Sequence, residues 1–250
     1  MLKILLSNDD GYKSKGIKLL YSSLKSYGNV IISVPHKDVS ACSSFLSVKK
    51  NIRVKKYTKD FYIVYGSTAD SVHIATRGIL KNLPSIVFSG INFGENMGDD
   101  VIYSGTVAAA IEGRFCKYAS AAISVTSKKP KYLADIKLKL EPILDLFFKK
   151  LYKYNNIFNI NIPDIPFEKI NGIKFTKLGR RDIPKRSKKY NHKHRLYYDI
   201  GDVGNYKRIN GDTDFNAVKN GYISITPLTI DMSDNIIFNK LQKKYDKHFK

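Results

Sequence analysis

The chain has 250 residues, of which 43% are apolar, and a formal net charge of +21 at pH 7. This length is near the upper end of what one hydrophobic core supports, so we expect a single α/β domain with a C-terminal extension. No apolar run approaches the roughly 20 residues of a membrane span, and Lys3 and two aspartates interrupt the N-terminal apolar stretch, which excludes a signal peptide. The two cysteines, Cys42 and Cys116, lack metal or redox spacing, which predicts a cytoplasmic location.

Strands and helices alternate along the first part of the chain. Apolar periodicity predicts five buried strands, at residues 3–6, 29–34, 85–90, 121–125 and 157–163. It also predicts four helices between them, at residues 14–27, 68–79, 106–115 and 133–151. Gly28 ends the first helix, and Pro35 ends the second strand. We therefore expect right-handed crossovers and a Rossmann-like, mostly parallel sheet with helices on both faces.

Two segments depart from this pattern. Residues 45–65 alternate more weakly, which is typical of an exposed hairpin rather than of core strands. From about Gly172 onward, short strands and loops surround a basic segment at residues 177–195. We therefore divide the chain, residues 1–250, into a Rossmann-like core over residues 1–171 and a β-rich extension over residues 172–250. We expect the extension to contact other subunits.

Polar side chains gather where three predicted strands end. The first strand leads to Asp9 and Asp10, the second to Ser40 and the third to Asn92. In parallel sheets these ends meet at one edge, where ligands bind. Each residue alone fits an ordinary turn, but together they offer hard oxygen donors, which suit Mg²⁺ or Mn²⁺ better than zinc. We expect one divalent metal ion per subunit, with positions left for a phosphate oxygen and a water.

The segment SGTVAAAIEG adds a second feature to the same edge. Ser104, Gly105 and Thr106 begin a helix whose first backbone N–H groups have no partner within the helix, which makes an anion site. The alternative is an ordinary helix cap. The polar, glycine-containing loop before it, which carries Asn96, favours a phosphate-binding role.

Missing motifs narrow the chemistry. The sequence has no GxGxxG after the first strand and no GxxxxGK[ST], which argues against a dinucleotide cofactor and a P-loop. It also has no GxSxG elbow. A covalent aspartyl-phosphate mechanism of the D-x-D-G kind needs an aspartate where Asn8 stands. We therefore expect direct attack of water on a phosphate ester.

Motifs along most of the chain resemble those of the SurE family, the survival protein E nucleotidases. The matching segments are LLSNDDG, VPHKDVSACSS, GSTADSV, SGINFGENMGDDVIYSGTVAAAIEG, FNINIP and DTDFNAVKNGYISITPL. The resemblance implies a Rossmann-like domain whose C-terminal extension forms a homodimer or homotetramer. It implies metal-dependent release of phosphate from nucleoside 5′- and 3′-monophosphates, and we add short polyphosphate as a further substrate.

The resemblance to the SurE family also implies which residues of this chain form the site. The metal ligands implied are Asp9, Asp10, Ser40 and Asn92. The phosphate pocket implied consists of Asn96, Ser104, Gly105 and Thr106. We expect the catalytic residues to be Asp9, Asp10 and Asn96.

Several positions depart from the family's usual residues. They are His36, Ser43, Phe45, Ser67, Thr68 and Ala108. None of them removes an implied metal ligand, so we expect the reaction type to be kept. Ser43 and Phe45 flank the substrate loop, where the ring of Phe45 would narrow or reshape the pocket. The resemblance therefore predicts the reaction type but not the preferred substrate.

The basic segment supports a competing function. Residues 177–195 combine arginines, lysines and histidines with Tyr190, as grooves for single-stranded nucleic acid do. The alternatives are a solvated loop in a lysine-rich protein, or a surface that holds the phosphates of a longer substrate. The second function we consider is therefore a nucleic-acid-binding protein with an idle phosphatase site.

Overall fold

The computed structural model describes residues 2–154, 156–193, 195–208 and 210–245. Its centre is a nine-stranded sheet of order β3-β4-β2-β1-β5-β6-β7-β11-β8. The parallel strands β4, β2, β1, β5, β6 and β7 span Phe61–Val64, Gly28–Pro35, Leu2–Ser7, Ile86–Phe93, Ser120–Val125 and Ile157–Ile162. Antiparallel pairing adds β3 (Val54–Thr58) beside β4 and β11 (Ile223–Leu228) beside β7, and β8 (Ile173–Phe175) runs parallel to β11. The predicted mostly parallel sheet is confirmed.

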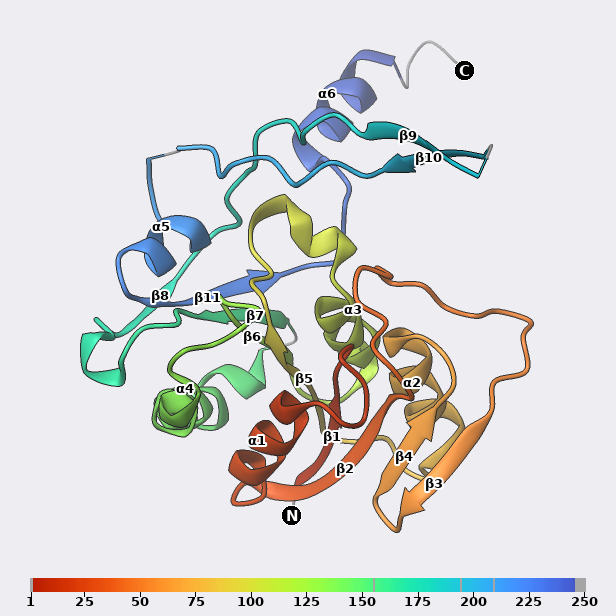
Figure 1. The fold of residues 1–250 in the computed structure, drawn as a ribbon. Helices are drawn as coiled ribbons and strands as arrows, with labels where there is room; N and C mark the ends of the chain where they lie inside the picture. The colour runs from red at the N-terminus through yellow and green to blue at the C-terminus, as the bar shows by residue number, and fades with distance from the viewer. Residues whose placement is uncertain (1, 155, 194, 209, 246–250) are drawn as a thin grey trace.

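Helices cover both faces of this sheet (Figure 1). One face carries α1 (Lys15–Leu24) and α4 (Ile136–Lys149), and the other carries α2 (Thr68–Ile74) and α3 (Gly105–Glu112). Along β1, Ile4 and Leu6 belong to the core under α1 and α4, whereas Leu5 belongs to the core under α2 and α3. This alternation follows from the two-residue period of a strand. Each fully buried leucine or isoleucine contributes about 1.5–3 kcal/mol to stability.

Polar caps fix where the helices begin. The hydroxyl of Ser14 accepts a hydrogen bond from the backbone N–H of Ile17 at the start of α1. Ser67 and Asp70 form a reciprocal capping box at the start of α2. Short helical turns of other types also occur: a π-helix at Ala75–Ile79 and 3₁₀ turns at Gly98–Tyr103, Gly113–Phe115, Leu133–Asp135, Leu151–Lys153 and Phe167–Lys169. Those next to α2, α3 and α4 account for these predicted helices being longer than the α-helical segments.

Residues 45–65 contain the predicted hairpin, formed by β3 and β4. The expectation that this hairpin lies outside the core sheet is wrong, because β4 pairs with β2 and is part of the main sheet. Ile63 and Val64 are buried there, whereas all of β3 is exposed. The weak alternation reflects this asymmetry, because one strand of the hairpin lies on the sheet and the other forms its edge.

One part of the C-terminal extension belongs to the main sheet, and another part forms a separate hairpin. Strands β8 and β11 join the sheet edge next to β7, and α5 (Asp214–Lys219) lies beside them (Figure 1). The hairpin of β9 (Lys188–His192) and β10 (Arg195–Asp199) forms a separate antiparallel pair away from the sheet, and α6 (Asn235–Tyr245) ends the described chain (Figure 1). Within the described residues, no helix combines the length and apolarity needed to cross a bilayer.

Candidate active site

Loops at the carboxyl ends of β1, β2, β5 and β6 surround a cavity of about 660 Å³. Its lining includes six of the predicted site residues: Asp9, Asp10, Ser40, Asn92, Asn96 and Ser104. The other two, Gly105 and Thr106, lie directly against Asp9. The structure therefore brings together every predicted residue, while their individual roles stay predictions.

Asp9 is held between β1 and the start of α3. Its side chain is almost fully buried, and its Oδ1 accepts a hydrogen bond of 2.6 Å from the hydroxyl of Thr106. A side-chain carbon at Gly105 would lie 2.9 Å from both Cβ and Oδ2 of Asp9. Burial raises the pKa of Asp9, and the Thr106 hydrogen bond opposes that rise. Glycine at position 105 is thus what allows the helix to approach this carboxylate.

Asp10 lies in a field of like charge. Burial, followed by the neighbouring carboxylates of Asp9 and Asp38, raises the pKa of Asp10 to about 7. Such a rise is the signature of carboxylates without a countercharge. A cation bound among them would stabilise their ionised forms.

The neutral donors are oriented with their oxygens available. The hydroxyl of Ser40, a lining residue, donates to Oδ1 of Asp38 at 2.6 Å, so its proton is engaged and its two lone pairs can still accept or bind a metal. The side-chain N–H of Asn92 donates to the carbonyl of Gly94 at 2.8 Å, and no hydrogen bond to Oδ1 of Asn92 is found among the residues that the structure describes. Both arrangements fit the oxygen donor set of Mg²⁺ or Mn²⁺.

The donor set carries little charge for a metal centre. Among the described residues, no group of three or more His, Cys, Asp or Glu side chains is arranged to hold a metal ion. An ion at this edge would depend on the two carboxylates Asp9 and Asp10, supplemented by neutral oxygens. That composition suits magnesium or manganese, which keep several waters, better than zinc.

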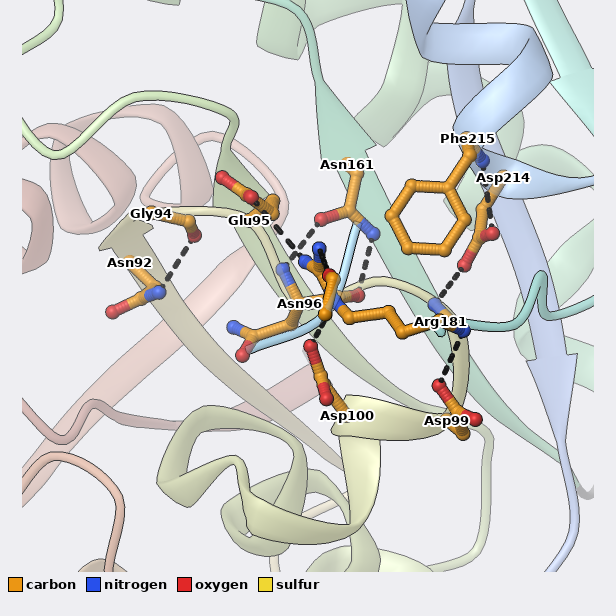
Figure 2. Close-up of polar contacts among 12 residues, drawn as sticks. Asn92, Gly94, Glu95, Asn96, Asp99, Asp100, Asn161, Arg181, Asp214 and Phe215 are labelled. Atoms are coloured by element: carbon orange, nitrogen blue, oxygen red, sulfur yellow. Dashed lines mark hydrogen bonds and ion pairs between the residues drawn. The ribbon is translucent and has the colours of Figure 1, made fainter. Parts of the chain in front are cut away.

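Asn96 is anchored by the neighbouring strand β7 (Figure 2). Its backbone N–H donates to Oδ1 of Asn161 at 2.9 Å, and its carbonyl accepts from the side chains of Asn159 and Asn161. Its own side-chain N–H donates to the hydroxyl of Ser124 at 2.8 Å. The sequence analysis missed these asparagines, although polar residues at alternate positions of a buried strand such as FNINIP are an available signal.

Ser104 acts as the N-cap of α3. Its hydroxyl accepts from the backbone N–H of Val107 at 3.0 Å, which agrees with the ordinary-cap alternative. Ser104 also lines the cavity, so the N-terminal end of α3 lies next to it. An anion site at this position stays a prediction.

Arg181 joins the extension to the loop that follows β5 (Figure 2). Its guanidinium forms ion pairs with Asp100 and Glu95, and it donates to the carbonyl of Gly204. Its backbone N–H donates to Asp99 at 3.1 Å. Only 13% of the Arg181 side chain is exposed. Our reading of this arginine as part of a polyanion-binding segment is therefore wrong, because its charge is used inside the protein.

Asp214 makes a second connection between the extension and this loop. Its buried carboxylate accepts hydrogen bonds from the backbone N–H groups of Gly98, Gly179 and Phe215, at 2.7 to 2.9 Å (Figure 2). A side-chain carbon at Gly98 would lie 2.6 Å from the Phe215 ring. The loop is thus packed as well as hydrogen-bonded against α5. Nothing in the sequence analysis singled out Asp214 by itself.

Ser43 and Phe45, two of the positions that depart from the family's usual residues, lie differently with respect to the cavity. Ser43 donates to the carbonyl of Ile102 at 2.6 Å and so ties the loop after β2 to the wall of the cavity. Phe45 is half exposed and is not among the lining residues, so its ring does not narrow this cavity. Asp38, Lys128 and Val203 line the cavity and were not predicted.

Comparisons with known proteins agree with this arrangement. The family model described as "Survival protein SurE" matches residues 4–185. A protein named 5′-nucleotidase SurE from Histophilus somni (strain 2336) is 39% identical over 250 residues, covering 98% of this chain and all of the relative. A protein of the same name from Legionella pneumophila (strain Paris) is 38% identical, with 96% of each chain covered.

A solved structure gives the same result for the fold. The crystal structure of the SurE protein from Aquifex aeolicus superimposes with a TM-score of 0.84 at 35% sequence identity. The match covers 98% of this chain and 100% of that one. With its acidic β1 end set against the start of α3, the chain belongs to the SurE family.

Proposed function

We propose that this protein is a metal-dependent phosphomonoesterase that hydrolyses nucleoside 5′-monophosphates to nucleoside and phosphate. The observation that carries the proposal is the contact between Asp9 and Thr106, which sets a metal-binding carboxylate beside the N-terminus of α3. A cation site and an anion site on the same cavity are what phosphate-ester hydrolysis needs. The relatives named 5′-nucleotidase SurE support the nucleotide substrate.

The divalent ion would be held by Asp9, Asp10, Ser40 and Asn92, with Mg²⁺ or Mn²⁺ as the candidates. When bound, such an ion screens the charge of a phosphate and lowers the pKa of a water. Thr106 keeps the Asp9 carboxylate in one orientation, and Asp38 holds the proton of the Ser40 hydroxyl. These two contacts arrange the ligands before the ion binds.

The remaining residues address the phosphate. The backbone N–H groups at the start of α3 would bind its oxygens, helped by the positive end of the helix dipole. Asn96, fixed by β7 and Ser124, would set one side of the phosphate pocket. None of these groups recognises the sugar or the base, so we extend the proposal to nucleoside 3′-monophosphates and, as a further substrate, to short polyphosphate.

We also propose that the protein is a homodimer or homotetramer that assembles through the extension. Large apolar side chains there are exposed, among them Ile183 at 92%, Ile200 at 94% and Phe238 at 56%. Exposed apolar side chains that gather into one patch are typical of an interface. Sedimentation velocity tests it: a monomer over the working concentration range would contradict the proposal.

The activity is tested by phosphate release from each nucleoside 5′- and 3′-monophosphate and from short polyphosphate. Asp9→Asn and Asp10→Asn should each lower the rate by about a hundredfold or more, with circular dichroism unchanged. Asp182→Asn, an exposed carboxylate of the extension, is the matched control. Phosphate release that persists in both Asp9→Asn and Asp10→Asn, or in excess EDTA, would contradict the proposal. Salt-dependent nucleic-acid binding without turnover would favour the competing function.

A further inference from the structure

The cavity is strongly acidic although the protein as a whole is basic. Its lining includes five carboxylates: Asp9, Asp10, Asp38, Glu95 and Asp100. Among the described lining residues the single basic side chain is Lys128. A phosphate dianion that enters such a cavity is repelled unless positive charge is placed inside it.

Arg181 contacts two of these carboxylates but neutralises only one of their two charges. Its guanidinium contacts Asp100, Glu95 and the carbonyl of Gly204, and little of it is exposed. It therefore has no free face for a substrate. One charge of that pair remains together with Asp9, Asp10 and Asp38, so the ionised carboxylates exceed a divalent cation by two charges.

Lys128 adds a positive charge to the same cavity. It lies in the loop after β6, and the end of β6 pairs with the end of β5, where Asn92 and Phe93 are paired with Ser124 and Val125. The aliphatic part of the Lys128 side chain lies beside Gly94. A side-chain carbon added at Gly94 would be 3.7 Å from Cγ of Lys128 and 3.7 Å from the side-chain nitrogen of Asn92. The side chain thus runs beside a predicted metal ligand.

The Lys128 ammonium is available for a ligand. It is exposed, and no hydrogen bond or ion pair to it is found among the residues that the structure describes. The adjacent Lys129 differs: its backbone N–H donates to the hydroxyl of Ser127, and it does not line the cavity. Two neighbouring lysines of the same loop therefore have different relations to the site.

We propose that Lys128 binds a phosphate oxygen of the substrate through its ammonium group, in the cavity that Ser104 at the start of α3 also lines. The inference rests on the proposed phosphomonoesterase function and adds to it the residue that recognises the charge of the phosphate. A charge-assisted hydrogen bond from a flexible lysine suits phosphate groups attached to different sugars. Lys128 therefore sets the affinity for the phosphate and not the choice of base.

Three variants test this role: Lys128→Met, Lys128→Arg and the control Lys129→Met. In Lys128→Met, kcat/KM for nucleoside 5′-monophosphates should fall about ten- to a hundredfold, mainly through KM. The inhibition constant of inorganic phosphate should rise by a similar factor. Lys128→Arg should recover most of both, and Lys129→Met should resemble the wild type. Magnesium affinity, measured by calorimetry, should be the same in all four proteins.

The result that overturns the inference is equal behaviour of Lys128→Met and Lys129→Met, with KM and phosphate inhibition both within about twofold of the wild type. Failure of the proposed function looks different, because then the wild type itself releases no phosphate. In that case, calorimetric binding of inorganic phosphate in the presence of Mg²⁺ still compares Lys128→Met with Lys129→Met. Equal phosphate affinity there also overturns the role of Lys128.

Discussion

The hydroxyl of Thr106 donates a 2.6 Å hydrogen bond to Oδ1 of Asp9, and so joins the start of α3 to the end of β1. Both residues are buried, and 97 residues separate them in sequence. A short bond between a hydroxyl and a carboxylate is a strong one. It holds one oxygen of the carboxylate that we propose as a metal ligand.

Thr106→Val removes this hydrogen bond while keeping the shape of the side chain. We expect magnesium affinity and kcat/KM to fall about tenfold, because the Asp9 carboxylate loses a charge-assisted partner and becomes free to rotate. Thr106→Ser, which keeps the hydroxyl, should stay close to the wild type. Magnesium titration calorimetry and phosphate release measure the two quantities. Equal metal affinity in the valine and serine variants would show that the bond does not orient Asp9.

Gly105→Ala tests the close approach of α3 to Asp9. The added methyl would stand 2.9 Å from Cβ and Oδ2 of Asp9, so either the helix or the carboxylate must move. We expect a loss of phosphate release of about a hundredfold with only a modest loss of stability. Gly78→Ala is the control, since its added carbon meets a single atom at 4.0 Å. An active Gly105→Ala enzyme would contradict the requirement for glycine.

Arg181→Ala tests whether the extension positions the active-site loop. Removing the guanidinium leaves Asp100 and Glu95 without their partner, and we expect a loss of about 1–3 kcal/mol in unfolding free energy. The rate should fall as well, because Asn96 lies in the same loop. Arg180→Ala, the exposed neighbour, should change neither quantity. Urea unfolding and phosphate release are the measurements, and an unaltered rate in Arg181→Ala would limit this arginine to a role in stability.

Much of the candidate site could be predicted from the sequence because its residues follow the carboxyl ends of parallel strands. Parallel strands end at a common edge, so Asp9, Ser40 and Asn92 converge whatever the exact strand boundaries are. The expected helices and central strands follow in the same way from apolar periodicity. These inferences need only local patterns and the direction of the strands.

The contacts of the extension could not be predicted in this way. Arg181 meets Asp100, which lies 81 residues earlier, and Asp214 meets Gly98, which lies 116 residues earlier. No periodicity relates such positions, and the many basic residues around Arg181 conceal the one that is buried. The role of Asp38 was missed for a related reason: it acts on Ser40 through a local turn and not from a strand end.

Magnesium should stabilise the folded protein. Burial, followed by the carboxylates of Asp9 and Asp38, raises the pKa of Asp10, and a bound cation would favour its ionised form. At a metal concentration about 100 times the dissociation constant, the gain is about 2.7 kcal/mol. Thermal unfolding with and without Mg²⁺ should therefore show a clear rise in the midpoint, which Asp10→Asn should largely abolish. A rise of equal size in that variant would place the binding ion elsewhere.

Lys139 predicts a pH dependence of stability outside the active site. Its side chain in α4 is fully enclosed, and its ammonium donates to the carbonyl of Ile165. Burial lowers the pKa of Lys139 below the 10.5 of an ordinary lysine, although Asp135, Asp164 and Glu168 oppose the shift. Between the two pKa values the unfolded chain binds more protons than the folded protein, so this group favours folding more as the pH rises.

Comparison with Lys139→Met isolates that contribution. As the pH rises toward the ordinary lysine pKa of 10.5, the unfolding free energy of the wild type should gain on that of the variant, because only the wild type releases this proton on folding. Lys137→Met, an exposed lysine of the same helix, is the control and should follow the wild type. Urea unfolding across the pH range gives the free energies. Parallel curves for the wild type and Lys139→Met would mean that the enclosed lysine keeps an ordinary pKa, and that the Ile165 carbonyl and the three nearby carboxylates offset the cost of its burial.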